Sequence, residues 1–284
     1  MPTPTTRRCL LALAGLTVFV AGCSSHTPDP GDPSSPAVSA PAQKTVLQPT
    51  PNAAFDYQLG GSYPPPQTAR ALSRDRTAEP VPGLYNICYV NAFQTQPGDA
   101  VAWWKTKHPE LLLRTEEGEL VVDEDWDEPL LDISTPNKRT ALLSIVGPWI
   151  DDCATADFDA VEPDNLDSYQ RSDGLLTEGD AIAFAQLLAQ RSHKQGLAIA
   201  QKNTTDLLDD HARIGFDFAV VEECAHYDEC SDFATAYKGK VFDIEYKDQD
   251  FRDACRSWGK QLSITLRDRD VRPAGQSGYI YQHC

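Results

Sequence analysis

Acidic and amide side chains recur in this sequence at the ends of short apolar segments. Glu162 and Asp164 end one such segment, and Glu222 and Glu223 end another. Carboxylates gathered at one rim of a sheet can act as acid, base or nucleophile, and amides beside them can bind hydroxyl groups. Each residue taken alone has an ordinary alternative as a loop residue or helix cap. The full set comprises Asp56, Gln58, Asn91, Asp132, Glu162, Asp164, Gln201, Asn203, Glu222, Glu223, Asp243 and Glu245.

A framework of alternating strands and helices would bring these residues together. Apolar strand-like segments alternate with helical stretches along the chain, which predicts a parallel sheet with crossover helices. Eight such segments predict an α/β fold of the (β/α)8 TIM-barrel type, in which the carboxyl ends of the strands form the active-site face. The expected strands are 55–59, 84–91, 130–133, 158–162, 197–201, 218–222, 241–245 and 262–266.

Two helices are signalled by local sequence. Thr177 and Asp180 resemble a capping box, apolar residues then recur at helical spacing, and Gly196 is expected to end the helix. A second helix is expected over 137–153, with Pro148 kinking or ending it.

The N-terminal residues predict export. Arg7 and Arg8 precede an apolar run, 9–20, that is too short to span a bilayer. The run leads into a Val-Ala-Gly-Cys sequence that resembles a bacterial lipobox, so we expect residues 1–22 to form a lipoprotein signal peptide and Cys23 to carry lipid. An ordinary cleaved signal followed by an incidental cysteine is the alternative.

Residues 23–52 are rich in Pro and Ser, which predicts a disordered tether, and residues 53–284 remain for one barrel domain. We therefore expect an exported protein held at the outer face of the cytoplasmic membrane by its lipid alone, or released to the medium.

The cysteines support export. Beyond Cys9 in the signal and Cys23, an even set remains, which in an exported chain predicts three disulfides. Spacing alone does not fix the pairing. A zinc site is the rival interpretation, but no CxxC motif supports it, so no metal is expected. The pairs that we expect are Cys88–Cys153, Cys224–Cys230 as a local loop clamp, and Cys255–Cys284 at the C-terminus.

The formal net charge of −17 argues against nucleic acid and anionic membrane surfaces as partners. A cationic ligand, such as a polymer of free amino sugars, fits this charge, although solubility alone also explains it. Gly60 and Gly61 lack the spacing of a nucleotide-binding loop, so no cofactor is expected. We further expect a monomer.

Five segments together resemble glycoside hydrolase family 114, the endo-α-1,4-polygalactosaminidase family of (β/α)8 barrels. They are residues 55–61, 89–92, 158–167, 201–203 and 222–230. The resemblance extends over residues 53–284. It implies an extracytoplasmic glycoside hydrolase that cleaves α-1,4-linked galactosamine polymers within the chain, by a retaining mechanism with two carboxylates.

The resemblance places one catalytic carboxylate on Asp164 and the other on Glu222 or Glu223, of which Glu223 is the better match. It implies Asp164 as nucleophile and Glu223 as acid/base, with the reversed assignment left open. One carboxylate must trap the positive anomeric carbon while the other, protonated, donates to the leaving oxygen. Neighbouring side chains on a strand point to opposite sides, so only one of Glu222 and Glu223 can face the site unless a bulge intervenes.

The remaining polar strand ends are expected to bind sugar hydroxyl or ammonium groups. Lys202 is expected either to anchor a carboxylate in the site or to point outward. Two alternatives are a non-catalytic, surface-anchored polysaccharide-binding barrel and a barrel hydrolase of a different glycan. A metal-dependent enzyme is a third, but the sequence contains no metal-binding motif such as HExxH to support it. The expected substrate-binding residues are Asp56, Gln58, Tyr89, Asn91, Asp132, Glu162, Gln201, Asn203, Glu222 and Glu245.

Overall fold

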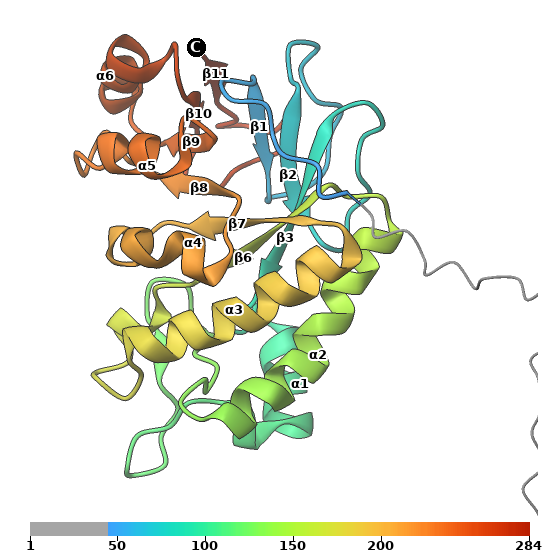
Figure 1. Ribbon diagram of the computed structural model, residues 1–284, viewed down its shortest axis with the longest axis vertical. Helices are drawn as coiled ribbons and strands as arrows, with labels where there is room; N and C mark the ends of the chain where they lie inside the picture. The colour runs from blue at the N-terminus through green and yellow to red at the C-terminus, as the bar shows by residue number, and fades with distance from the viewer. Residues whose placement is uncertain (1–44) are drawn as a thin grey trace, which may run out of the picture. The chain divides into compact units, whose positions relative to one another are not determined.

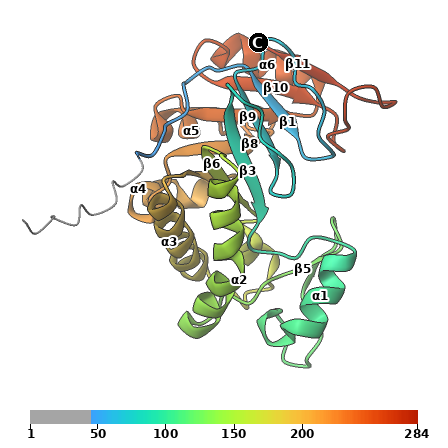
Figure 2. The same cartoon turned by 90° about the vertical axis from the view of Figure 1, so that its right-hand side faces the viewer.

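The computed structural model describes residues 45–284, so the predicted signal peptide, Cys23 and most of the predicted tether lie outside the described residues. The described chain forms a nearly closed, mostly parallel sheet with helices on its outer side (Figures 1 and 2). The predicted α/β barrel is therefore confirmed. Within residues 45–284, no helix has the length and apolar character needed to cross a membrane.

Eight parallel strands follow one another around the sheet, and a short last strand, β11, runs antiparallel to β10. The first and eighth of these strands meet where Thr265 Oγ1 donates to the Phe55 carbonyl at 2.7 Å. In sheet order the strands are β1 (Phe55–Gln58), β2 (Ala71–Asp75), β3 (Tyr85–Asn91), β6 (Ala160–Asp164), β7 (Ala198–Lys202), β8 (Phe218–Glu222), β9 (Val241–Glu245), β10 (Ser263–Arg267) and β11 (Tyr281–His283).

The predicted strand 130–133 is wrong as a barrel strand, and β2 takes its place in the count. Leu130 and Leu131 form only isolated bridges beside a small antiparallel hairpin, β4 (Val122–Asp123) and β5 (Glu128–Pro129). Both leucines are fully buried, so their apolar character reflects core packing rather than a strand. The strand β2 escaped prediction because it is polar, with Ser73 and Arg74 buried in hydrogen bonds.

The helices cover only part of the barrel, because residues 59–70 and 76–84, which join β1 to β2 and β2 to β3, contain none. Figures 1 and 2 show α2 and α3 side by side on the outside of the sheet. The α-helices are α1 (Asp99–Lys107), α2 (Pro136–Thr155), α3 (Glu178–Gln195), α4 (His211–Ile214), α5 (Cys230–Tyr237) and α6 (Asp248–Trp258), and the 3-10 helices are η1 (Pro109–Leu111), η2 (Ser168–Arg171) and η3 (Thr205–Asp210).

The predicted capping box is confirmed, since Thr177 and Asp180 exchange hydrogen bonds at the start of α3, and Gly196 ends the helix in the left-handed conformation with φ 83°. The helix α2 does not end at Pro148 as one expectation had it. Pro148 is exposed, and buried Val146 and Ile150 hold the helix on both sides of it.

Two separate cores set the direction of every strand side chain. One fills the barrel interior and the other lies between the strands and the outer helices. Along β8, Phe218 and Val220 belong to the interior, whereas Ala219 and Val221 belong to the outer core. Because strand side chains alternate, the next residue, Glu222, continues the inward-facing row.

Three disulfides brace the barrel, and all three predicted pairs are confirmed. Cys88–Cys153 ties β3 to α2, Cys224–Cys230 closes the loop after β8, and Cys255–Cys284 ties α6 to the C-terminus. Their thiols are therefore not available as the ligands that a zinc site would need.

The predicted tether extends too far into the chain, because residues 45–52 contact the barrel. Gln48 Nε2 donates to Asp217 Oδ1 at 2.8 Å, and Asn52 Nδ2 donates to the Leu262 carbonyl at 2.7 Å. Asp217 and Leu262 directly precede β8 and β10. This segment therefore runs along the amino-terminal ends of the strands, and its amides satisfy backbone and side-chain groups there.

Removing Cys88–Cys153 is expected to destabilise the fold more than removing Cys224–Cys230, because the disulfides close loops of 65 and 6 residues. The loss of loop-closure entropy corresponds to about 4 kcal/mol for the long loop and about 2 kcal/mol for the short one. Urea unfolding of the two paired Cys→Ala variants measures the difference. Both pairs are buried, so the variants are matched, and equal losses would contradict the expectation.

Candidate active site

A buried lysine joins three carboxylates at the carboxyl end of the barrel. The side chain of Lys202 is 3% exposed, and its Nζ lies 2.8 Å from Asp164 Oδ1, 3.0 Å from Glu222 Oε2 and 3.6 Å from Glu162 Oε1. These residues end β6, β7 and β8, three neighbouring strands, and continue their inward-facing rows. Lys202 therefore points into the barrel and contacts carboxylates of the site, rather than pointing outward.

Asp164 is held as an anion. Tyr89, on the adjacent strand β3, donates its hydroxyl to Asp164 Oδ2 at 2.5 Å, while Lys202 donates to the other oxygen. Burial by itself would raise the pKa of Asp164, but the charge of Lys202 and these hydrogen bonds outweigh it and bring the pKa below its usual value. Asp164 is still partly exposed, so a ligand can reach it.

Glu222 has a similar environment on the other side of Lys202. Tyr246 donates its hydroxyl to Glu222 Oε1, and Asn203 Nδ2 donates to Oε2 at 3.2 Å. Asn203 also accepts from the Glu222 backbone N–H at 2.8 Å, which fixes the end of β8. Burial would raise the pKa of Glu222, but Lys202 and the Tyr246 hydrogen bond bring it below its usual value.

Glu162 lies deeper in the barrel, where its surroundings favour the neutral form of the carboxyl group. It accepts from Tyr57 Oη at 2.8 Å and from Ser73 Oγ at 2.6 Å, and it is fully buried. Burial raises the pKa of Glu162 to about 7, although Lys202 acts against this. Burial would also lower the pKa of Lys202, but Asp164, Glu222 and Glu162 raise it well above its ordinary value, so the lysine stays protonated.

Glu223 leaves the strand and faces a different partner. Its backbone is in the left-handed region, with φ 58°, and its carboxylate accepts from Arg269 Nη1 at 2.6 Å. Lys247 Nζ lies 3.8 Å from the other oxygen. Because Glu222 rather than Glu223 contacts Lys202, the geometry favours Glu222 over the predicted Glu223 as the partner of Asp164.

Asn91 and Glu128 extend the site past Asp164. Asn91 Nδ2 donates to Glu128 Oε2 at 2.9 Å, and Asn91 Oδ1 accepts from Asn165 Nδ2 at 3.0 Å. Burial, reinforced by the charge of Asp164, raises the pKa of Glu128 to about 7. Glu128 was not predicted, because it comes from the hairpin inserted after β3 rather than from the end of a barrel strand.

Asp56 and Gln58 lie in a separate buried network. Gln58 Nε2 donates to Asp56 Oδ2 at 2.6 Å, and Gln58 Oε1 accepts from Arg74 Nε at 2.9 Å. Arg267 Nη1 lies 3.4 Å from Asp56 Oδ1, and both side chains are fully buried. Protein partners therefore take up the groups that were expected to bind sugar.

Three further predicted residues also lie apart from the Lys202 cluster. Gln201 and Glu245 belong to the outward-facing rows, where Gln201 accepts from Tyr237 Oη at 2.5 Å and Glu245 accepts from the Ala225 N–H at 2.8 Å. Asp132 pairs with Lys138 at the start of α2. The structure thus gathers Tyr89, Asn91, Glu162, Asp164, Asn203 and Glu222 around one rim, but not the other five predicted substrate-binding residues, Asp56, Gln58, Asp132, Gln201 and Glu245.

Tyr57 and Tyr246, two of the tyrosines considered as stacking platforms for sugar, also belong to the cluster, where their hydroxyls donate to Glu162 and Glu222. The alternation of side chains along a strand indicates which cluster residues face inward. On β7, Ala198 and Ala200 face the barrel interior, so the next residue in that row, Lys202, must face it too. The same two-residue period applies to Phe242 and Ile244 on β9 and to Tyr246, the residue directly after this strand.

The raised pKa of Glu162 predicts a loss of stability at high pH. The pKa of Glu162 is about 7 in the folded protein, whereas the unfolded chain releases this proton near the ordinary glutamate pKa of 4.5. Binding of this proton therefore stabilises the folded state by about 3 kcal/mol. The stabilisation is fully present below the pKa of the unfolded state and is lost as the pH rises through the pKa of the folded state. We expect Glu162→Gln to flatten the decline in unfolding free energy between roughly pH 5 and pH 8. Urea unfolding measures it, with exposed Glu117→Gln as the matched control; an unchanged slope in the Glu162 variant would refute this explanation.

Comparison with known proteins places the chain in a family. The sequence model of glycoside-hydrolase family GH114 matches residues 36–284. Ega3 of Aspergillus fumigatus, solved in complex with galactosamine, is 24% identical, with 85% of this chain and 98% of that chain covered and a TM-score of 0.67. The glycoside hydrolase domain of PelA from Pseudomonas aeruginosa is 17% identical, with 80% and 99% covered and a TM-score of 0.56. No curated protein matches the chain significantly. The two structures support the fold, and the family match over most of the chain shows that this protein belongs to glycoside-hydrolase family GH114.

Proposed function

We propose that the protein hydrolyses an α-1,4-linked, galactosamine-containing polysaccharide within its chain and with retention, through Asp164 and Glu222. The observation that carries this proposal is their common contact with Lys202. Because Lys202 Nζ lies 2.8 Å from one carboxylate and 3.0 Å from the other, the two contacting oxygens are at most about 6 Å apart. Retaining glycosidases hold their two carboxyl groups about 5–5.5 Å apart, whereas inverting enzymes need a wider gap for water.

Asp164 is the proposed nucleophile, because its lowered pKa keeps it ionised. Its oxygen attacks the anomeric carbon as the glycosidic C–O bond breaks. Glu222, in the protonated form that its lowered pKa restricts to acidic pH, donates a proton to the leaving oxygen. In the second half, Glu222 takes a proton from water, whose oxygen displaces Asp164 from the anomeric carbon. Glu222 replaces Glu223 in this proposal, since Arg269 engages Glu223 at the rim.

The charge of the site supports an amino-sugar substrate. The whole chain carries −17, and the rim gathers more carboxylates than cations around the reacting position. The ammonium groups of a galactosamine polymer would be attracted by this field and guided to the site. That Ega3 was solved with galactosamine supports the same sugar here.

Export is proposed together with this activity. The lipobox-like sequence ending in Cys23 would anchor the protein outside the cytoplasm, where a polysaccharide substrate is accessible. Three disulfides support an oxidising location, because such bonds rarely persist in the cytosol. We propose that the protein acts as a monomer without a cofactor.

Substitution of the two carboxylates tests the catalytic assignment. On an α-1,4-galactosamine polymer, Asp164→Asn and Glu222→Gln are each expected to lower kcat at least ~10³-fold, since each removes a group that acts on the reacting bond. Glu223→Gln is the matched control, with an expected loss below ~10-fold because Arg269 rather than substrate engages this residue.

Reducing-end release measures kcat, and NMR of the first product reports retention. A full loss in Glu223→Gln with activity left in Glu222→Gln would reverse the assignment. A wild-type protein that binds the polymer without releasing product would favour the polysaccharide-binding barrel instead.

Lys202 also predicts the pH dependence of the reaction. Its charge lowers the pKa of both Asp164 and Glu222, so the wild-type profile of kcat/KM is expected to lie on the acidic side of neutrality. Lys202→Gln removes that charge and should move both limbs of the profile to higher pH. Lys202→Arg, which keeps the charge, is the control. Limbs that stay in place in Lys202→Gln would show that the lysine does not set these pKa values.

A further inference from the structure

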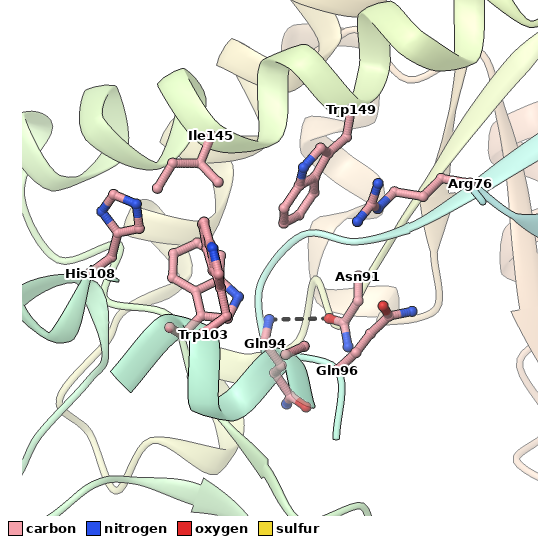
Figure 3. A pocket seen from close by; sticks show the side chains of 10 residues that line it. Arg76, Asn91, Gln94, Gln96, Trp103, His108, Ile145 and Trp149 are labelled. Carbon is pink, nitrogen blue, oxygen red and sulfur yellow. Dashed lines mark hydrogen bonds between the residues drawn. The ribbon is translucent and has the colours of Figure 1, made fainter. Parts of the chain in front are cut away.

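A cavity of about 480 Å³ lies between α1 and α2 beyond the end of β3 (Figure 3). This volume falls within the range of small-molecule sites. Trp149 and Ile145 extend from α2 toward Trp103 on α1, and Arg76 and Gln96 lie at the other end of the opening (Figure 3). No residue of this cavity takes part in the reaction proposed above.

Two tryptophans on opposite walls give the cavity its shape. Trp103 is 41% exposed although it is a large apolar side chain, and Trp149 is only partly buried. An indole ring combines a wide apolar face with one N–H donor, so it can pack against the C–H face of a pyranose ring while the hydroxyl groups bind elsewhere. Gln94, Gln96 and Asn91 supply amides in the same cavity, the mixture that sugars require.

The charge of the lining excludes the sugar expected at the catalytic rim. Arg76 is the lining residue with a permanent charge, and its guanidinium lies over the Trp149 ring, 4.3 Å from the ring centre. Acids lie beside the lining but not in it: Gln96 donates to Asp75 at 2.9 Å, Gln94 donates to Asp123 at 3.2 Å, and His108 lies 3.6 Å from Glu110. An ammonium group would meet a cation here, whereas the carbonyl of an acetamido group would meet N–H donors.

Asn91 connects this cavity to the catalytic rim. It lines the cavity, and it lies directly opposite Asp164 in the pairing of β3 with β6. A polysaccharide chain that reaches Asp164 can therefore continue past Asn91. We propose that the cavity is a further subsite that binds an uncharged N-acetylhexosamine unit of the same polysaccharide; this inference rests on the proposed function.

Binding measured without hydrolysis tests the subsite. Calorimetric titrations use the full chain carrying Asp164→Asn and three oligosaccharides of equal length: a galactosamine oligomer, its partly N-acetylated form, and an oligogalacturonate. The partly acetylated oligomer is expected to bind tightest. Trp103→Ala should weaken its binding about tenfold, because one stacked aromatic ring contributes on that order. The galactosamine oligomer should be affected less.

Ile280→Ala is the matched control, since Ile280 is also 41% exposed but is not part of the cavity lining. Arg76→Gln should reduce the preference for the acetylated oligomer. Equal binding of that oligomer by the Trp103→Ala and control variants would overturn the proposal, as would tightest binding of the acidic oligomer. These titrations are independent of turnover, so a wild-type protein that releases no product refutes the proposed hydrolysis and leaves the subsite test intact.

Discussion

A single buried ammonium group organises the carboxyl end of this barrel. Three carboxylates and one lysine come from neighbouring strands, and an isolated buried charge would be costly. Lys202 offsets the repulsion between Asp164 and Glu222, while the raised pKa of Glu162 limits the total negative charge of the cluster. The arrangement keeps Asp164 ionised, restricts protonation of Glu222 to acidic pH, and favours the neutral form of Glu162 beneath them. Small side chains below Lys202, Ala198 and Ala200, leave room for its long stem inside the barrel.

The adjacent acids Glu222 and Glu223 show how one residue of register separates two environments. Glu222 continues the inward row of β8 and meets Lys202, Tyr246 and Asn203. Glu223 begins the turn, takes a left-handed backbone conformation and meets Arg269. Sequence similarity alone cannot distinguish two identical neighbours, but the period of the strand can, provided that its interior residues are known.

Signals confined to a few residues were sufficient to predict much of the fold. The capping box of α3 and most of the parallel strands required only local pattern. The strand β2 could not be recognised, because Ser73 and Arg74 are polar in order to bond with residues far along the chain. Asp56 was misleading for the same reason, since its partner Arg267 is 211 residues away. Long-range polar pairing leaves no trace in hydrophobic periodicity, and strand ends alone do not reveal which side a residue faces.

The short segment before β1 has a consequence for access to the site. Gln48 and Asn52 fasten it beneath β8 and β10, at the foot of the barrel, whereas Lys202 and its acids sit at the mouth. Residues 45–52 thus lie at the face opposite the acids and leave the mouth uncovered. A long polymer can approach the mouth without meeting this segment.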